Sequence, residues 1–188
     1  MDFDRARPSR SPWTSRSVLA PADGVKPDSA RSKDRMTVPD RADDAPLSTT
    51  LPGTWRLLSR IDIAGGQPHA DPALGSDPIA LLIYDRAGNF SAQFMKRDRS
   101  TAPVDGPIGA SNNTQAQGGY DAYFGTYAVD DATGVVTQRL LGAISNGNVG
   151  LVLSRVMTVR GDSLIIELQT NAWDGTPVTR TLTWQRVG

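Results

Sequence analysis

Residues Gly119–Leu141 read GYDAYFGTYAVDDATGVVTQRLL, and this stretch predicts two β-strands joined by a tight turn. Bulky and small side chains alternate from Tyr120 to Val129, and a β-branched pattern resumes from Val135 to Leu141. Between them, Asp130–Gly134 supplies the Asp and Gly residues of a short hairpin connection. Gly125 lies inside the first strand, where a glycine weakens a sheet unless another backbone or a ligand comes close, or the sheet bends sharply. The hairpin therefore predicts a curved sheet with something inside it.

Similar patterns recur along the chain as far as residue 187. Turn-forming residues separate them at short intervals, and no stretch shows the 3.6-residue periodicity of a helix. Eight strands in simple succession predict an all-β fold, an eight-stranded antiparallel up-and-down β-barrel with room for packed side chains or one small ligand. The strands are expected from Trp55 onward and at Ile79–Tyr84, Asn89–Lys96, Tyr120–Val129, Val135–Leu141, Val149–Arg160, Ser163–Thr170 and Pro177–Val187.

The first strand has the two faces of a half-buried strand. One face carries Trp55, Leu57, Ser59 and Ile61, and the other carries Arg56, Leu58, Arg60 and Asp62.

Residues 1–50 differ in composition from the rest of the chain. They are rich in Arg, Asp, Ser and Pro and show neither helical nor strand periodicity. Such a segment cannot bury enough apolar surface to offset its ordering entropy of roughly 1–2 kcal/mol per residue. We therefore expect a disordered tail over residues 1–50 and one barrel domain over residues 51–188. The long polar connection Arg97–Gly118 is predicted to be a functional lid or a disordered excursion.

Composition excludes several kinds of site. The chain has no cysteine, which excludes disulfides, thiolate nucleophiles and Cys-based metal sites. Its one histidine, His69, lies in a Pro-rich loop and is expected to be an ordinary loop residue, so we expect no metal and no cofactor. The formal net charge is zero, which gives no field to gather nucleic acid or to bind an anionic membrane. The sequence shows neither a transmembrane run nor a secretory signal, so a cytoplasmic location is expected.

Several short motifs resemble a known family. Gly53-Thr54-Trp55 on the first strand resembles the Gly-x-Trp opening of lipocalins, and Leu182-Thr183-Trp184-Gln185-Arg186 ends the chain in a similar way. With Leu82-x-Tyr84, Tyr120–Tyr127 and Gly134-Val135-Val136-Thr137 between them, the sequence resembles the bacterial and fungal lipocalin-like domain family over about Leu51–Val187.

This resemblance implies a calycin-type barrel in which Trp55 closes one end and is covered by Arg186 through stacking and a cation–π contact. Members of the family often carry consecutive histidines after the Val-Thr of the central hairpin, where this chain has Gln138 and Arg139. The resemblance therefore implies no imidazole proton chemistry at that place.

Strand parity predicts which polar side chains face the interior. Arg155 lies in the apolar row of the strand Val149–Arg160, and Arg180 lies in the apolar row of the last strand. A buried cation needs an anion, a carbonyl group or water as its partner. The two arginines either pair with Glu167 or Asp121 or extend to the rim, or they bind the carboxylate or enolate-like oxygen of a mainly apolar ligand.

Tyr123 and Tyr127 lie on one face of the central hairpin, on either side of Gly125. They would either supply flat apolar walls and hydroxyl donors to a ligand or fill the core and form hydrogen bonds at the barrel ends. The candidate ligand-binding residues are Tyr84, Gln93, Tyr123, Tyr127, Arg139, Arg155 and Arg180.

These features predict a barrel that binds one small hydrophobic molecule with a carboxylate or carbonyl oxygen. The alternative is a cofactor-independent cyclase or isomerase of secondary metabolism acting on a polyketide- or terpene-like substrate in the same cavity. Related barrels include allene oxide cyclase and polyketide-folding cyclases, and such chemistry needs mainly orientation and a few hydrogen bonds. A third reading is a filled barrel that serves as an interaction domain. The expected partner is the small molecule, with a homodimer left open and neither nucleic acid nor a membrane expected.

Overall fold

The structure is a computed structural model that describes residues 45–100, 105–106 and 112–188. All eight strands predicted from the sequence are present, and the two-residue strand β2 is additional. The sixth predicted strand begins later than expected, at Val152, because Val149 and Leu151 lie in the turn that precedes it. The elements are α1 (Leu47–Thr50), β1 (Gly53–Ala64), β2 (Gln67–Pro68), β3 (Ile79–Tyr84), β4 (Asn89–Met95), β5 (Tyr120–Asp130), β6 (Val135–Ala143), the 3-10 turn η1 (Asn146–Asn148), β7 (Val152–Arg160), β8 (Ser163–Asn171) and β9 (Pro177–Arg186).

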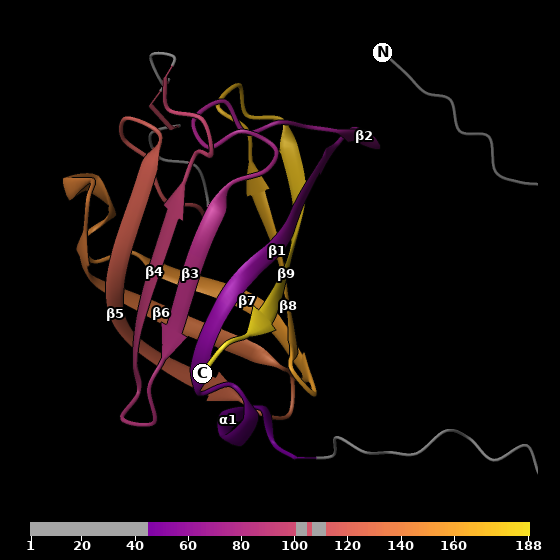
Figure 1. Ribbon diagram of the computed structural model, residues 1–188, viewed down its shortest axis with the longest axis vertical. Coiled ribbons are helices and arrows are strands. Elements are labelled where there is room, and N and C mark those ends of the chain that lie inside the picture. The colour runs from indigo at the N-terminus through magenta and orange to yellow at the C-terminus, as the bar shows by residue number, and fades with distance from the viewer. Residues whose placement is uncertain (1–44, 101–104, 107–111) are drawn as a thin grey trace, which may run out of the picture. The chain divides into compact units, whose positions relative to one another are not determined.

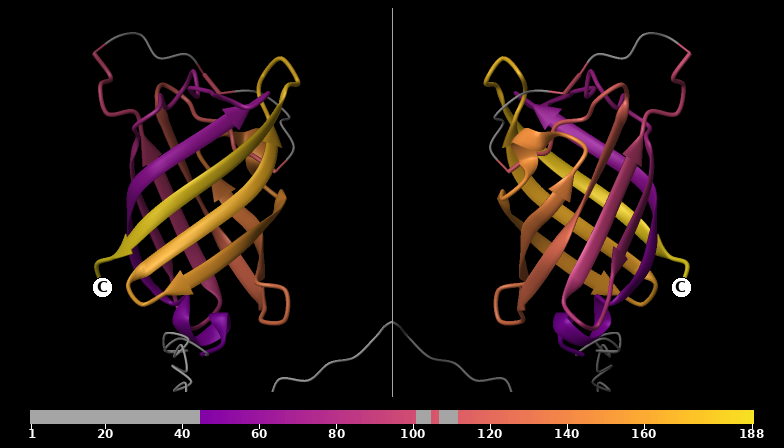
Figure 2. Two further views of the ribbon diagram at one scale, coloured as in Figure 1. Left: turned by 90° about the vertical axis from the view of Figure 1, so that its right-hand side faces the viewer. Right: turned by 90° about the vertical axis from the view of Figure 1, so that its left-hand side faces the viewer.

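The strands pair antiparallel with their neighbours in chain order from β3 to β9, and β1 pairs with both β3 and β9. The last strand therefore returns to the first and closes the sheet into a barrel (Figures 1 and 2). Closure pairs the first and last strands, which would otherwise be open edges of the sheet. The predicted eight-stranded antiparallel up-and-down barrel is confirmed. Below, the α1 end is the end beside α1, and the mouth is the opposite end, where residues 69–78 and 112–118 lie (Figure 1).

A β-bulge in β1 changes which residues face the interior. The register between β1 and β9 shifts between Leu57 and Ser59. Trp55 is buried before the bulge, whereas Arg60 and Asp62 are buried after it and Ile61 is exposed. The sequence places Arg60 and Asp62 on the face opposite Trp55, and this assignment is wrong because one extra residue reverses the alternation. The bulge therefore puts an ion pair inside the barrel.

A second irregularity explains Gly125 in the central hairpin. The register between β5 and β6 shifts between Phe124 and Gly125. A Cβ atom at Gly125 would lie 1.9 Å from the carbonyl oxygen of Arg139, so no larger residue fits without moving the backbone. Gly125 is therefore required by the close approach of the Arg139 backbone, in a sheet that bends sharply enough to close.

The α1 end is closed as the resemblance implies. The Arg186 guanidinium carbon lies 4.1 Å from the centroid of the Trp55 ring, and the Trp55 indole N–H donates to the Leu51 carbonyl oxygen at 3.0 Å. Arg186 also donates to the carbonyl oxygens of Thr50 and Pro52. These contacts tie the chain before β1 to the end of β9.

A short helix lies within the segment that the sequence predicts to be a disordered tail. Residues 47–50 belong to the predicted disordered tail, but they form α1, and Ser48 donates to the Asp131 carboxylate from both its backbone N–H and its hydroxyl. The short helix is held by capping contacts with the barrel, which the composition of the segment does not reveal. The prediction for residues 1–44 lies outside the described residues. No helix in the described part of the chain is long and apolar enough to cross a bilayer.

Candidate ligand-binding site

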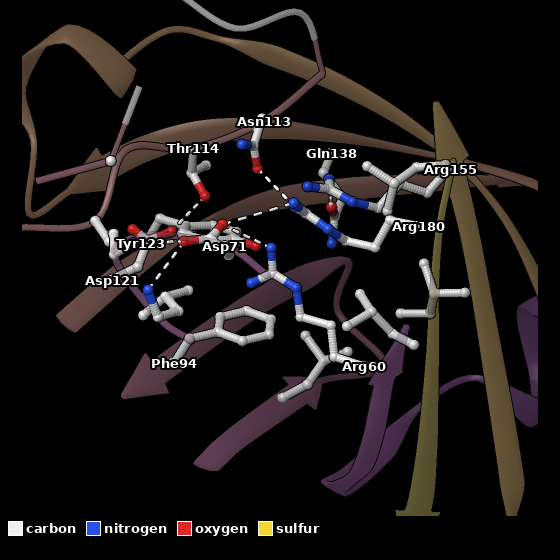
Figure 3. A pocket seen from close by; sticks show the side chains of 18 of the residues that line it. Arg60, Asp71, Phe94, Asn113, Thr114, Asp121, Tyr123, Gln138, Arg155 and Arg180 are labelled. Carbon is white, nitrogen blue, oxygen red and sulfur yellow. Dashed lines mark hydrogen bonds and ion pairs between the residues drawn. The ribbon is translucent and has the colours of Figure 1, made fainter. Parts of the chain in front are cut away.

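A cavity lies inside the mouth half of the barrel (Figure 3). The space between its lining atoms is about 610 Å³ including the part that opens to solvent, but the centre of a water molecule can reach only about 40 Å³ of it. Toward the α1 end the interior is filled by packed side chains that include Tyr84, Phe90, Leu140 and Met157. The walls combine apolar residues (Leu82, Phe94, Ile166, Leu168, Leu182, Trp184) with polar ones (Arg60, Asp71, Thr114, Asp121, Gln138, Arg155, Arg180).

Four charged side chains form a network along one side of this cavity. Arg180 donates to both carboxylate oxygens of Asp62, at 2.8 and 2.9 Å. Arg60 donates to Asp62 at 2.7 Å and to Asp71 at 2.6 Å, and Asp71 also accepts from the backbone N–H groups of Ala73 and Leu74. The network joins β1, β9 and the loop before β3, so it fixes that loop over the mouth.

The pKa values of this network follow from competition between burial and pairing. Burial alone would raise the pKa values of Asp62 and Asp71, but hydrogen bonds and charges from Arg60 and Arg180 outweigh it and lower both pKa values. The two carboxylates likewise outweigh burial and raise the pKa of Arg60, whereas burial and repulsion from Arg60 lower the pKa of Arg180. An arginine stays charged in either case. The network therefore contains two positive and two negative charges at neutral pH.

Arg155 stands apart from this network. Its side chain enters the cavity from β7, and the residue is only 7% exposed. It donates to the amide oxygen of Gln138, whose amide group donates to the Tyr84 hydroxyl at 2.7 Å. Within the described residues no carboxylate lies within 4.0 Å of Arg155. The hydrogen-bond acceptor of this buried cation is instead the neutral amide of Gln138.

Asp121 lies across the cavity from the arginines (Figure 3). The residue is 2% exposed, and one carboxylate oxygen, Oδ2, accepts a short hydrogen bond from the Thr114 hydroxyl. Among the described residues the other oxygen, Oδ1, is buried without a hydrogen-bond partner, and so is the indole N–H of Trp184, another residue that lines the cavity. Burial raises the pKa of Asp121 to about 6, against the opposing effects of Thr114 and Arg155. Two residues that line the cavity thus have a buried acceptor and a buried donor that no described residue pairs with.

Residues 112–117 cross the mouth as a strap. Asn113 accepts from Arg180 at 2.9 Å, Thr114 binds Asp121, and Gln115 accepts from Ser145 at 2.8 Å. The strap is thus attached to β5, β9 and the turn after β6. This position fits the expected lid, while residues 101–104 and 107–111 of the same connection lie outside the described residues.

Asn112 fills a gap in the barrel wall beside the strap. The ladder between β7 and β8 runs from Arg160 and Ser163 only as far as Val156 and Glu167. Beyond that point the Asn112 amide donates to the Ser154 and Gln169 carbonyl oxygens and accepts from the Ser154 N–H. One side chain thus replaces part of the missing ladder, which locks the strap to the wall.

The candidate residues from the sequence fall into two groups. Tyr84, Tyr123, Arg155 and Arg180 line the cavity. Tyr127 faces the interior nearer the α1 end, where its hydroxyl donates to the Asp85 carbonyl oxygen at 2.7 Å and its ring packs on Tyr84. Gln93 accepts from Tyr120 on the outer surface, and Arg139 is exposed between the inward residues Gln138 and Leu140. These three side chains do not line the cavity, so we leave them out of the site.

The pairing of Arg180 also differs from the alternatives considered for it. Its partner is Asp62, which the bulge in β1 turns inward, whereas Glu167 is exposed on β8. Sequence reasoning missed Arg60, Asp62 and Asp71 altogether. It noted Gln138 only as a replacement for histidine. Of the neighbours Gln138 and Arg139, Gln138 is the one that faces inward, and it accepts a hydrogen bond from Arg155. The parity of β6 was the signal that could have identified it.

The arrangement can bind an oxygen atom at Arg155 and exchange a hydrogen bond or a proton at Asp121. In the described residues there is no group of three or more His, Asp or Glu side chains that could hold a metal ion. The chemistry that the site offers is therefore charge stabilisation and hydrogen bonding by arginine, carboxylate and tyrosine side chains.

Comparison with known proteins agrees with this architecture. A family model described as a lipocalin-like domain matches residues 52–187, which is nearly the whole barrel. No curated protein sequence matches the chain. The match spans well over half of the sequence and coincides with the closed barrel and the Trp55–Arg186 contact. The chain belongs to the lipocalin-like domain family.

Proposed function

We propose that the barrel binds one small, mainly apolar molecule whose carbonyl or carboxylate oxygen accepts hydrogen bonds from Arg155. The observation that carries this proposal is the buried Arg155 guanidinium in a cavity of apolar and polar walls, with no carboxylate within 4.0 Å of it among the described residues. A buried cation with no anion in direct contact is costly, and an oxygen-bearing ligand offsets that cost. Gln138 and Tyr84 orient the Arg155 side chain, so the donor is placed before the ligand arrives.

The other arginines are poorer candidates for this role. Arg60 and Arg180 already share the carboxylates of Asp62 and Asp71. Withdrawing either arginine from the network would deprive a buried carboxylate of one of its cationic partners. A ligand therefore gains more from Arg155 than from either member of the network.

The size of the cavity limits the ligand. A bound water needs roughly 10–15 Å³ of space for its centre, so the roughly 40 Å³ available holds only a few waters. A larger ligand has to displace side chains or the strap at residues 112–117. Packing of aromatic residues toward the α1 end favours a ligand held in the mouth half, with Leu82, Leu182 and Trp184 against its apolar part.

The test is binding of small ketones and carboxylates to the purified full-length chain. We choose acetophenone, cyclohexanone, benzoate and cyclohexanecarboxylate, followed by NMR chemical-shift titration. At least one of them is expected to bind with a Kd of about 1 mM or lower. Arg155→Met is expected to weaken that binding at least about tenfold, because an arginine hydrogen bond to an oxygen in a buried site is lost. Binding by none of the four, or equal binding by Arg155→Met, would refute the proposal.

Arg139→Met is the matched control for that experiment. Arg139 lies on β6 beside Gln138, but its side chain is on the outer surface. The variant removes the same charge from the chain without touching the cavity. Its binding of the four compounds is expected to equal that of the wild type.

A cofactor-independent isomerase or cyclase in the same cavity is a second candidate, and Asp121 favours it. Its carboxyl group has one oxygen without a partner, its pKa is raised to about 6, and it lies across the cavity from Arg155. A carboxylate with a pKa near neutrality is suited to accept a proton from carbon. The C–H bond beside a carbonyl would break, its proton would move to Asp121, and the electron pair would pass to the carbonyl oxygen at Arg155 as an enolate.

Proton exchange in D₂O distinguishes the two candidates. If the second is correct, the chain accelerates exchange of the methyl protons of acetophenone above the buffer rate, and Asp121→Asn abolishes the acceleration. If the site only binds, titration detects binding while the exchange rate stays at the buffer value. Exchange that persists in Asp121→Asn would assign the proton transfer to another group.

A further inference from the structure

We propose that the ligand carries a hydroxyl group in addition to its carbonyl group, and that this hydroxyl donates a hydrogen bond to Asp121 Oδ1. The site would then select hydroxy-carbonyl compounds, of which phenolic ketones are the simplest apolar examples. This inference rests on the proposed function, because it places the carbonyl oxygen at Arg155.

The first support is the unequal use of the two Asp121 oxygens. Oδ2 accepts from the Thr114 hydroxyl, whereas Oδ1 is buried and accepts from no described residue. Leaving a buried acceptor unpaired is unfavourable, and more so when the group is charged. That cost is recovered when a ligand supplies a donor.

The second support is the position of this oxygen relative to the other cavity groups. Asp121 and Arg155 both line the cavity, from β5 and β7, and Figure 3 shows their side chains on opposite sides of it. A ligand bound at Arg155 therefore extends toward Asp121. Trp184 also lines the cavity, and its buried indole N–H has no hydrogen-bond partner among the described residues. Because this donor needs an acceptor, we expect the ligand to have more polar atoms than the one oxygen at Arg155.

The third support is the balance of charge. Arg60 and Arg180 are balanced by Asp62 and Asp71, and Arg155 is balanced by Asp121 when Asp121 is ionised. A ligand carboxylate would add an unbalanced negative charge to the cavity. A neutral carbonyl group can accept from Arg155 and a neutral hydroxyl group can donate to Asp121 without changing the charge balance. The charge balance therefore favours a hydroxy ketone over a hydroxy acid.

The test compares acetophenone with its 2-, 3- and 4-hydroxy and methoxy derivatives on the wild-type chain. A methoxy group keeps the oxygen but cannot donate a hydrogen bond. At least one hydroxy isomer is expected to bind about tenfold more tightly than acetophenone, while its methoxy counterpart gains nothing. This comparison needs no variant, so it does not depend on whether a substitution folds.

The same ratio is then measured in two variants. Asp121→Val has nearly the shape of the wild-type side chain without its oxygens, and it is expected to remove the advantage of the hydroxy isomer. Glu167→Gln, which neutralises an exposed carboxylate on β8, is expected to keep it.

The outcomes separate this inference from the proposed function. If acetophenone binds in an Arg155-dependent way but no hydroxy isomer gains affinity, or if the gain survives in Asp121→Val, the hydroxyl inference is wrong and the proposed function stands. If neither acetophenone nor any derivative binds, both are wrong.

Discussion

The two halves of the barrel interior are stabilised by different physics. At the α1 end the chain buries large apolar side chains, with Trp55 under the Arg186 guanidinium and aromatic rings packed above it. At the mouth it buries Arg60, Asp62, Asp71, Arg155 and Arg180, whose charges must be satisfied by one another or by a ligand. Apolar burial stabilises a fold whatever is bound, whereas buried charges stabilise it only when every charge is paired.

This difference teaches where function and stability lie in the molecule. The α1 end is filled by packed apolar and aromatic side chains. At the mouth, one buried oxygen of Asp121 accepts no hydrogen bond from the described residues, and the buried cation Arg155 donates to a neutral amide. A site that is incomplete by itself becomes complete when a ligand of matching polarity binds.

The largest effect is expected from Trp55→Ala at the α1 end. The substitution leaves a large void and takes the ring away from Arg186, so the free energy of unfolding should fall by about 4 kcal/mol. Urea denaturation followed by circular dichroism measures the loss. Trp173→Ala is the control, because Trp173 is 77% exposed and its removal should cost less than about 0.5 kcal/mol. A loss at Trp55 as small as that of the control would contradict the assigned role of this end.

A slightly smaller loss, about 3 kcal/mol at pH 7, is expected from Asp62→Asn at the mouth, because two buried arginines lose their shared carboxylate. The pKa of Asp62 is lowered in the fold, so its contribution is present at neutral pH and disappears as the pH falls below the usual carboxyl value of about 4. Wild type and variant should therefore converge in acid, whereas the loss from Trp55→Ala should not depend on pH.

Denaturation at several pH values between neutral and strongly acidic conditions checks that contrast. Asp77→Asn is the matched control, because Asp77 pairs with Arg97 at 2.8 Å on the exposed surface. Exposed pairs contribute little, so this variant should lose less than about 1 kcal/mol. Equal losses at Asp62 and Asp77 would show that the buried network does not stabilise the mouth.

The smallest effect, and one of opposite sign, is expected from Asp121→Asn. The pKa of Asp121 is raised to about 6, so ionisation of this group weakens the fold as the pH rises from about 4 to about 6. The variant cannot ionise and should be more stable than wild type by about 2 kcal/mol at pH 7, with the gap closing in acid. Stability curves at pH 4 and pH 7 measure it, and a variant less stable than wild type at pH 7 would contradict an ionised, unpaired Asp121.

The strand pattern and the interior faces of most strands could be predicted from local alternation. Arg155 and Arg180 were assigned to apolar rows, and both side chains line the cavity. Alternation along a strand predicts whether a side chain faces inward, but it does not predict where along the barrel axis that side chain lies. Tyr127 faces inward as its row requires, yet it lies nearer the α1 end and bonds to a turn rather than lining the cavity. Gln93 and Arg139 were included although their own strands place them outside.

By itself, the sequence determined the closed antiparallel barrel, the contact between Trp55 and Arg186 implied by its resemblance, and a polar interior that includes arginine. The barrel and its polar interior follow from alternation along the strands, and the Trp55–Arg186 contact follows from the family resemblance. Tertiary structure alone decided that Asp62 pairs with Arg180, that Asp71 closes the network from a loop, and that Asp121 keeps an oxygen without a partner. The reason is physical: a bulge reverses a face without a sequence signal, and a buried charge is paired by whichever strand closure brings beside it.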